Sequence, residues 1–355
     1  FSHQEEMLNA ATKSNLGYFQ APTGSGKSYV QAAIAAESIR QGGFKVIVVS
    51  SPRIGLSNQL AGSFLEYFSK TGLDGSKFET LLVHSGDSVE MNEELADEVL
   101  VSNIKSTTNG VAMQEMLAEA KAQNIPAIIF TTYHSTLKFV ERAKVSVDLH
   151  INDEAHYLTR EDFSGIPTGF TAGRRYFFTA TPIFGASEDG RGFDNAEIFG
   201  ERLYQMSVAE AVQRKLITPI NAQILTSVRR LSQRQLDKQC GRLVLESINA
   251  LRTRYTEMGA KLLVAGRGAT QIGIFLGSDE FDTLRDQGVE ILTVHSTNEF
   301  TTHNGQQVSR ERFDELMYKF GKDQAKEVVI VHYDILSEGI DVPGLLGVLI
   351  LRKLK

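Results

Sequence analysis

Short runs of Val, Ile, Leu and Phe alternate along the first half of the chain with longer stretches whose apolar residues recur at helical spacing. Apolar runs without alternation are typical of strands that are covered on both faces, as in parallel sheets. Strands are predicted at Gly17–Gln20, Lys45–Ser50, Thr80–His84, Ala127–Thr132, Val147–Asp153 and Tyr176–Thr179. Helices are predicted between them at Ser28–Arg40, Leu56–Phe68, Val111–Gln123 and Ser135–Ala143.

The second half of the chain resumes this alternation after a break near residues 200–225. There a short helix predicted at Val208–Lys215 leads into an extended segment that contains Pro219. Strands are then predicted at Leu262–Ala265, Glu290–Val294, Val328–Val331 and Gly347–Leu351, and helices at Arg234–Met258, Gln271–Leu284 and Arg310–Phe320. Residues 296–309 are polar and are predicted to form a loop. The pattern predicts an α/β fold with a first domain at 1–205, a linker at 206–228 and a second domain at 229–355.

Length and composition narrow the class of protein. A chain of 355 residues usually exceeds one hydrophobic core, and 42% apolar with 23% charged residues is typical of a globular protein. The formal charge of −6 means that any nucleic-acid binding has to come from a local groove. All apolar runs are much shorter than the ~20 residues of a membrane span, so we expect no membrane partner. Phe1 is not an initiator residue, and we expect this sequence to be an internal piece of a longer protein.

The single cysteine, Cys240, excludes an internal disulfide and a zinc site built from several cysteines.

Residues 21–28, APTGSGKS, follow a predicted strand and open a predicted helix, which is the context of a phosphate-binding loop. Small residues there let backbone N–H groups converge on phosphate oxygens at a helix N-terminus. Lys27 is predicted to reach the β- and γ-phosphates, and the Ser28 hydroxyl to coordinate Mg²⁺. A chance glycine-rich turn explains this context poorly. The residues predicted to bind the nucleotide are Thr23, Gly24, Ser25, Gly26, Lys27 and Ser28.

A second motif, NDEAH at 152–156, directly follows an apolar run. A carboxylate at a strand end beside a phosphate loop can hold Mg²⁺, and Asp153 fits this role. A neighbouring carboxylate can orient and deprotonate an attacking water, and Glu154 fits that role. Two acidic residues after a strand are common in isolation. In combination with the phosphate loop, these two acidic residues predict an enzyme that hydrolyses ATP and requires Mg²⁺.

Together with further motifs, the phosphate loop and the DEAH box resemble the superfamily 2 helicases and translocases, and most of all the DEAH-box DNA helicases of phages and restriction-type systems. The resemblance extends from about Gln4 to Leu351, and a loop that starts at Ala21 is typical of that superfamily. It implies two RecA-like parallel-sheet lobes with a nucleotide cleft between them. It also implies a catalytic-site role for His156 and a cytoplasmic location in a bacterial or phage-infected cell.

The resemblance also assigns roles outside these two boxes. Gln4 would read adenine, while Thr179 and Thr181 of the TATP motif would couple hydrolysis to domain movement as hydroxyl partners of the DEAH box. In the SEGIDVP motif, Gly339 and Asp341 would face the nucleotide. The residues implied to contact nucleic acid are Pro52, Arg53, Gln59, Thr132, Tyr133, Arg267 and Ser337.

One motif of the resembled family is missing. The sixth, Q-x-x-G-R-x-x-R, should follow the strand that ends at Leu351, and the second lobe is therefore expected to be truncated. Arginines of that motif normally reach the γ-phosphate as an arginine finger does. We expect this piece to bind ATP and to turn it over poorly.

The motifs predict an ATP-dependent DNA helicase or translocase whose partner is single-stranded or branched DNA. A double-stranded DNA translocase that drives a restriction or defence nuclease without strand separation would carry the same motifs. An RNA helicase is disfavoured, because the elements SEGIDVP at 337–343 and TTYHS at 131–135 are more similar to the DNA branch. A nucleotide-gated switch that binds a protein is the alternative from another class. The motifs are also compatible with a protein partner or a fused domain outside this piece.

Overall fold

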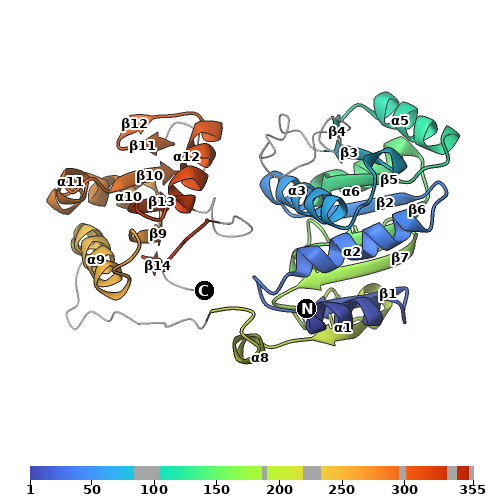
Figure 1. Cartoon of the computed structure of the whole chain (residues 1–355), viewed down its shortest axis with the longest axis horizontal. Coiled ribbons are helices and arrows are strands. Elements are labelled where there is room, and N and C mark those ends of the chain that lie inside the picture. The colour runs from blue at the N-terminus through green and yellow to red at the C-terminus, as the bar shows by residue number, and fades with distance from the viewer. Residues whose placement is uncertain (84–103, 186–189, 219–232, 296–300, 334–341, 352–355) are drawn as a thin grey trace. The chain divides into compact units, whose positions relative to one another are not determined.

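The computed structural model describes residues 1–83, 104–185, 190–218, 233–295, 301–333 and 342–351. The chain divides into two compact units, Phe1–Asn221 and Ala222–Lys355. Each unit is built on one β-sheet with helices packed on both faces (Figure 1). Within the described ranges, no helix is both long enough and apolar enough to cross a membrane.

The first unit contains an eight-stranded sheet in the order β4-β3-β5-β2-β6-β7-β1-β8. All its strand pairs are parallel, which confirms the predicted α/β fold. The strands are β1 (Leu16–Gln20), β2 (Val46–Ser51), β3 (Glu79–Val83), β4 (Ile104–Ser106), β5 (Ala127–Thr132), β6 (Val147–Asn152), β7 (Ala172–Thr179) and β8 (Glu201–Gln205). The helices are α1 (Ser2–Ala11), α2 (Lys27–Arg40), α3 (Ile54–Lys70), α5 (Gly110–Ala122), α6 (Tyr133–Ala143), α7 (Ala196–Phe199) and α8 (Val208–Gln213), with 3-10 turns η1 (Gly75–Lys77) and η2 (Ala155–Thr159).

Strand β2 shows why the apolar runs of this unit lack alternation. Successive side chains of a strand point to opposite faces of the sheet. Ile47 and Val49 pack with α1, α2 and α3 in one core cluster, whereas Val46 and Val48 pack with α5 and α6 in another. Burying each such side chain contributes about 1.5–3 kcal/mol, so both faces favour an apolar residue at every position.

The second unit contains a six-stranded sheet in the order β12-β11-β10-β13-β9-β14. Strands β9 (Lys261–Ala265), β10 (Glu290–Val294), β13 (Val328–His332) and β14 (Gly347–Ile350) are parallel, whereas β11 (Thr302–His303) and β12 (Gln306–Gln307) are antiparallel. Residues of α9 (Gln233–Arg254), α10 (Ala269–Leu276) and α11 (Asp279–Asp286) pack on one face, and those of α12 (Arg310–Lys322) on the other.

Two predictions for this unit were wrong. Within the predicted loop, residues 302–307 form a hairpin, because Asn304 (φ 49°) and Gly305 (φ 85°) adopt the left-handed conformations of a two-residue turn. The predicted helix Gln271–Leu284 is interrupted at Gly277 and Ser278, which separate α10 from α11. The helix α1 and the strands β4 and β8 of the first unit were not predicted from sequence.

Candidate functional site

The motifs of the first unit gather at the edge of the sheet where its parallel strands end. The loop 21–26 follows β1, Asp153 follows β6, Arg53 follows β2, and Thr179 is the last residue of β7. These strands are neighbours in the order β2-β6-β7-β1. The carboxyl edge of a parallel sheet is where α/β folds place ligand sites, so the topology brings together residues that are distant in sequence.

The loop between β1 and α2 is shaped by two glycines. Gly24 (φ 81°) and Gly26 (φ 83°) both adopt left-handed conformations that other residues rarely reach. Gly26 is the N-cap of α2, so the first N–H groups of a 14-residue helix face the loop. Such a helix end favours anions. The loop is anchored to the sheet because the Ala21 N–H donates to the Thr179 carbonyl oxygen at 3.2 Å.

Lys27 begins α2 and is 7% exposed. Its Nζ donates to the backbone carbonyls of Ala21 at 3.1 Å and Pro22 at 3.3 Å. The ammonium group is therefore held inside the loop, close to the N-terminus of the helix. Ser28 occupies the next helical position and is partly exposed.

Residues of helix α1 contact this loop at Ser25 and Gly26. The His3 Nε2 lies 2.8 Å from the Ser25 carbonyl oxygen. A Cβ at Gly26 would lie 2.5 Å from the Gln4 Nε2, so only glycine permits this approach of the amide. The structure thus brings Gln4 to the phosphate loop. Thr23, by contrast, is exposed at the loop surface.

Asp153 directly follows β6 and is 5% exposed. Its Oδ1 accepts a hydrogen bond from the Gln31 Nε2 at 2.6 Å, and its carbonyl oxygen accepts one from the Tyr133 hydroxyl at 2.5 Å. Burial raises the pKa of Asp153 above its ordinary value, although the charge of Lys27 and the Gln31 hydrogen bond act in the opposite direction. Because Lys27 and Asp153 interact electrostatically, the phosphate loop and the DEAH box belong to one site.

Glu154 and His156 are the partly buried residues of the DEAH box, whereas Asp153 and Ala155 are buried. Glu154 is a non-glycine residue in the left-handed region (φ 49°), a conformation that costs ~1 kcal/mol or more and is concentrated at functional sites. The His156 Nδ1 lies 3.3 Å from the Glu154 Oε2 and 3.1 Å from the Thr179 Oγ1. Burial lowers the pKa of His156 to about 4, with smaller contributions from Arg160 and Lys27. The imidazole is therefore neutral at pH 7 and acts by hydrogen bonding.

Thr179 extends this chain of contacts to the TATP motif. Its Oγ1 accepts a hydrogen bond from the Thr181 N–H at 3.1 Å. Thr179 is fully buried, whereas the Thr181 side chain is exposed. The structure thus joins the DEAH box to the backbone of the loop after β7.

The donor set fits Mg²⁺ that arrives with nucleotide phosphates. Among the described residues, no group of three or more His, Cys, Asp and Glu side chains could hold a metal ion by itself. Mg²⁺ is usually held by one or two carboxylates together with substrate phosphates. Asp153 supplies such a carboxylate, and the hydroxyl of Ser28 lies in the first turn of α2.

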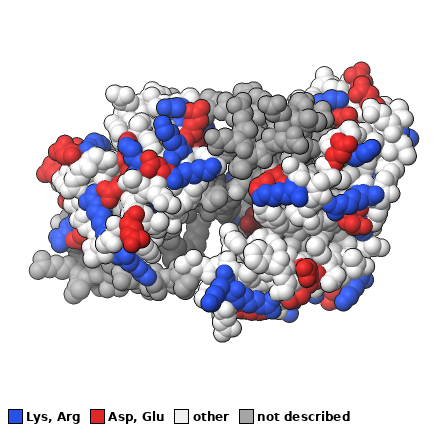
Figure 2. Space-filling view, viewed as in Figure 1, with Lys and Arg blue, Asp and Glu red and all other residues white. Residues whose placement is uncertain are grey.

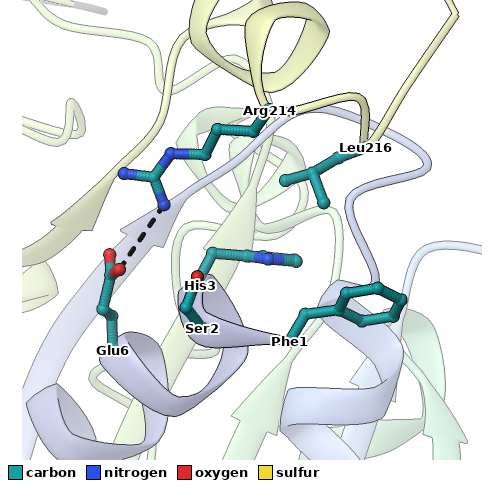
Figure 3. Close-up of a pocket in the computed structure, with 6 residues that line it drawn as sticks. All are labelled: Phe1, Ser2, His3, Glu6, Arg214 and Leu216. Carbon is teal, nitrogen blue, oxygen red and sulfur yellow. Dashed lines mark hydrogen bonds and ion pairs between the residues drawn. The ribbon is translucent and has the colours of Figure 1, made fainter.

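A pocket of about 520 Å³ opens between the start of α1 and the segment that follows α8 (Figure 3). The Arg214 Nη1 and the Glu6 Oε1 face each other across it at 3.4 Å. Since His3 also contacts Ser25, the pocket adjoins the loop. Its lining consists of Phe1, Ser2, His3, Glu6, Arg214 and Leu216.

The side chains implied to contact nucleic acid differ widely in exposure. Gln59 is exposed and Arg53 partly exposed, whereas Pro52, Thr132 and Tyr133 are buried. Tyr133 is only 1% exposed, so its ring is not positioned to stack on a base.

In the second unit, the Arg267 Nη2 pairs with both carboxylate oxygens of Asp237, at 2.9 and 3.1 Å. Ser337, Gly339 and Asp341 lie outside the described residues.

Two residues of the site were missed by sequence analysis. Gln31 stands one helical turn after Lys27, and its one signal was a polar residue within an otherwise apolar helical stretch. Arg160 follows the DEAH box, with its guanidinium 3.7 Å from the centre of the Tyr157 ring. Burial lowers the pKa of Arg160, and the nearby charge of Arg53 lowers it further. Two arginines therefore lie near each other at this sheet edge.

Comparisons with known proteins agree with this architecture. The solved structure of the ATP-dependent Type ISP restriction-modification enzyme LlaBIII bound to DNA aligns with a TM-score of 0.70 at 19% identity, covering 100% of this chain and 26% of that chain. The DEAD-box helicase Mss116 bound to ssRNA and UDP-BeF aligns with a TM-score of 0.56 at 14% identity, covering 99% and 64%. These likenesses show the fold, and this chain spans only about a quarter of the LlaBIII chain. No curated protein gives a significant match.

A family model provides the assignment. The model for "Type III restriction enzyme, res subunit" matches residues 1–184, which is just over half of the 355 residues. This range contains the phosphate loop, the DEAH box and the TATP motif, which form the site described above. The chain belongs to the family of the Type III restriction enzyme res subunit, within the restriction-type branch of the superfamily 2 helicases.

Proposed function

We propose that this chain is an ATP-driven DNA motor, which couples ATP hydrolysis to movement along DNA or to its remodelling. The observation that carries the proposal is the meeting of Lys27 and Asp153 at one sheet edge, with His156 connected to Thr179 beside them. The solved LlaBIII structure is of an ATP-dependent enzyme bound to DNA, which supports DNA as the partner, whereas the Mss116 structure, with its lower TM-score, is bound to single-stranded RNA.

In this proposal the nucleotide lies across the N-terminus of α2. Lys27 and the N–H groups of the loop bind the phosphates, because both present positive charge at the helix end. Asp153 and Ser28 hold Mg²⁺, which neutralises phosphate charge when it is bound. The base lies in the pocket beside α1, where Gln4 and His3 contact the phosphate loop.

The DEAH box supplies the proton transfer. Glu154 is the general base that orients the attacking water and accepts its proton. His156 is neutral, so its Nδ1, 3.3 Å from the Glu154 carboxylate, limits the positions of that carboxylate without forming an ion pair. His156 also contacts Thr179. A displacement of the loop after β7 therefore changes the position of the general base, Glu154. This is the proposed link between hydrolysis and movement.

Arg53 and Arg160 are the proposed contacts to the DNA backbone. Arg53 follows the carboxyl end of β2, and its charge lowers the pKa of Arg160, which follows η2. Contacts to phosphates carry no sequence information directly, so we expect little sequence preference and strong salt dependence.

The test is ATP hydrolysis with and without DNA at low salt, measured on a protein that also carries the sixth motif, because this piece is expected to turn ATP over poorly. Lys27→Ala should lower the DNA-stimulated rate at least ~100-fold, because a preorganised positive group at the phosphates is lost. Lys45→Ala is the matched control: Lys45 also donates to a backbone carbonyl, that of Ser38, near the other end of α2. ATPase activity that DNA leaves unchanged would instead favour a nucleotide-gated protein switch. Stimulation by RNA alone would favour an RNA helicase.

Strand separation and translocation need a second experiment. A strand-displacement assay reports unwinding, whereas displacement of a triplex-forming strand reports movement along intact duplex. Triplex displacement without unwinding would identify a double-stranded DNA translocase.

A further inference from the structure

Gln31 is a fully buried glutamine at the centre of the candidate site. It lies four residues after Lys27 on α2, so the two side chains share one face of the helix. Its exposed fraction is 0%, and the helix around it is apolar, with Val30, Ala32 and Ala33 also buried. An aliphatic side chain would suit this environment better than an amide.

The amide makes one short hydrogen bond and leaves one atom without a partner. Its Nε2 donates to the Asp153 Oδ1 at 2.6 Å. An ionised carboxylate only accepts hydrogen bonds, so the nitrogen of the amide has to face it. Among the described residues, the Gln31 Oε1 has no hydrogen-bond partner. Burying an unpaired acceptor costs about 1–3 kcal/mol, so folding stability alone does not account for a glutamine here.

We infer that Gln31 is a positioning residue for the Mg²⁺–nucleotide site. Its amide binds one oxygen of Asp153 and so fixes the rotation of the carboxylate, which leaves Oδ2 free of this hydrogen bond. Lys27, Ser28 and Gln31 all belong to α2. This helix therefore fixes the position of the Asp153 carboxylate relative to the phosphate-binding groups. The inference rests on the proposed function, in which Asp153 holds the ion.

The experiment measures metal affinity directly, with Mn²⁺ as the probe. Mn²⁺ binding to the whole chain in the presence of ADP is followed by electron paramagnetic resonance. Gln31→Met keeps the side-chain length and removes the donor, and we expect Mn²⁺ affinity to fall about 10-fold, as for other groups that orient metal ligands. ADP affinity in EDTA should stay unchanged. Gln31→Asn is the second variant, for use if Gln31→Met folds poorly. It keeps the amide but is too short for the hydrogen bond, so we expect the same loss of Mn²⁺ affinity.

Ser38→Ala is the matched control. Ser38 lies two turns further along the same helix and is 1% exposed, but it bonds to Ile34 and Arg174 instead of the site. Its loss should lower thermal stability and leave Mn²⁺ affinity unchanged.

Asp153→Asn separates the inference from the proposal on which it rests. If Asp153→Asn binds Mn²⁺ as tightly as the unchanged chain, the proposed metal site is wrong. If Asp153→Asn weakens Mn²⁺ binding and both folded Gln31 variants retain full affinity, the inference about Gln31 is overturned by itself.

Discussion

At the scale of the residue, Tyr133 differs most from the role that its motif implied. Its ring packs against Phe163, with ring centres 5.7 Å apart, and its hydroxyl donates to the Asp153 carbonyl oxygen. Burial raises the pKa of Tyr133 well above its ordinary value, so the hydroxyl keeps the proton that it donates. Tyr133 also opens α6, directly after Thr132 at the end of β5. It therefore connects the TTYHS segment to the DEAH box.

Tyr133→Phe removes this hydrogen bond and leaves the Asp153 carbonyl oxygen without it. We expect the free energy of unfolding to fall by about 1–3 kcal/mol, measured by urea unfolding, while DNA affinity is unchanged. Tyr29→Phe is the control, because the Tyr29 hydroxyl is at the surface and its bond to Glu66 is long, at 3.4 Å. The opposite result, weaker DNA binding with unchanged stability, would support a direct DNA contact by Tyr133.

At the scale of the elements, a buried polar network joins β2, β6, β7 and α6. The Arg175 Nε donates to the His150 Nδ1 at 3.2 Å, so the proton of the neutral imidazole is on Nε2. The Nε2 lies 2.9 Å from the Ser50 Oγ, which lies 3.0 Å from the Thr136 Oγ1. Thr136 in turn donates to the Thr132 carbonyl oxygen at 3.0 Å. The network fixes α6 against the strands that carry the site.

This network predicts acid sensitivity. Burial lowers the pKa of His150 well below its ordinary value of 6.5, and the charge of Arg175 lowers it further. The folded state then binds fewer protons than the unfolded state below pH 6.5. The contribution of the buried, neutral His150 to the free energy of unfolding is therefore fully present above pH 6.5. It is lost as the pH falls, by up to about 2 kcal/mol at pH 5.

Urea unfolding at pH 7 and pH 5 measures this effect. His150→Asn should reduce the difference between the two pH values, although it also lowers stability at pH 7. His134→Asn is the control, since His134 is exposed and should leave the difference unchanged. An unaltered pH difference in the His150 variant would rule out this histidine as its source.

At the scale of the whole molecule, the net charge is negative and offers no general attraction for DNA. The formal charge is −6, and on the face seen in Figure 2 basic and acidic side chains are interspersed. Local positive charge at the candidate site comes from Lys27, Arg53 and Arg160. DNA binding should therefore depend on a few local contacts rather than on the field of the entire protein.

Arg160→Ala tests this local origin. Each lost phosphate contact reduces the slope of log K against log salt by about 1, so the variant should bind DNA more weakly and with a shallower slope at every sequence. Fluorescence anisotropy between about 50 and 200 mM salt measures the slope. Arg242→Ala is the control, because Arg242 is 73% exposed and pairs with Glu246 on α9. A slope identical to that of the unchanged chain would exclude Arg160 as a phosphate contact.

The sequence by itself determined the features that a few consecutive residues are enough to specify, namely the strands and the phosphate loop. Apolar runs covered on two faces specify parallel strands, and APTGSGKS specifies a loop and a helix start because its glycines and its lysine act within one turn of chain. Errors arose where the apolar pattern was absent, as around Asn304 and Gly305, whose turn joins two short strands of polar residues.

Only the tertiary structure decided which partners these residues meet. Gln31 and Asp153 are separated by 122 positions, and Tyr133 and Asp153 by 20, and no local pattern relates them. They meet because the order β5-β2-β6-β7-β1 places the ends of strands from distant parts of the chain at one edge. Burial at this edge raises the pKa of Asp153 and lowers that of His156, and the Tyr133 side chain is also buried there. Burial depends on how all the elements pack, so the sequence of any one element does not determine it.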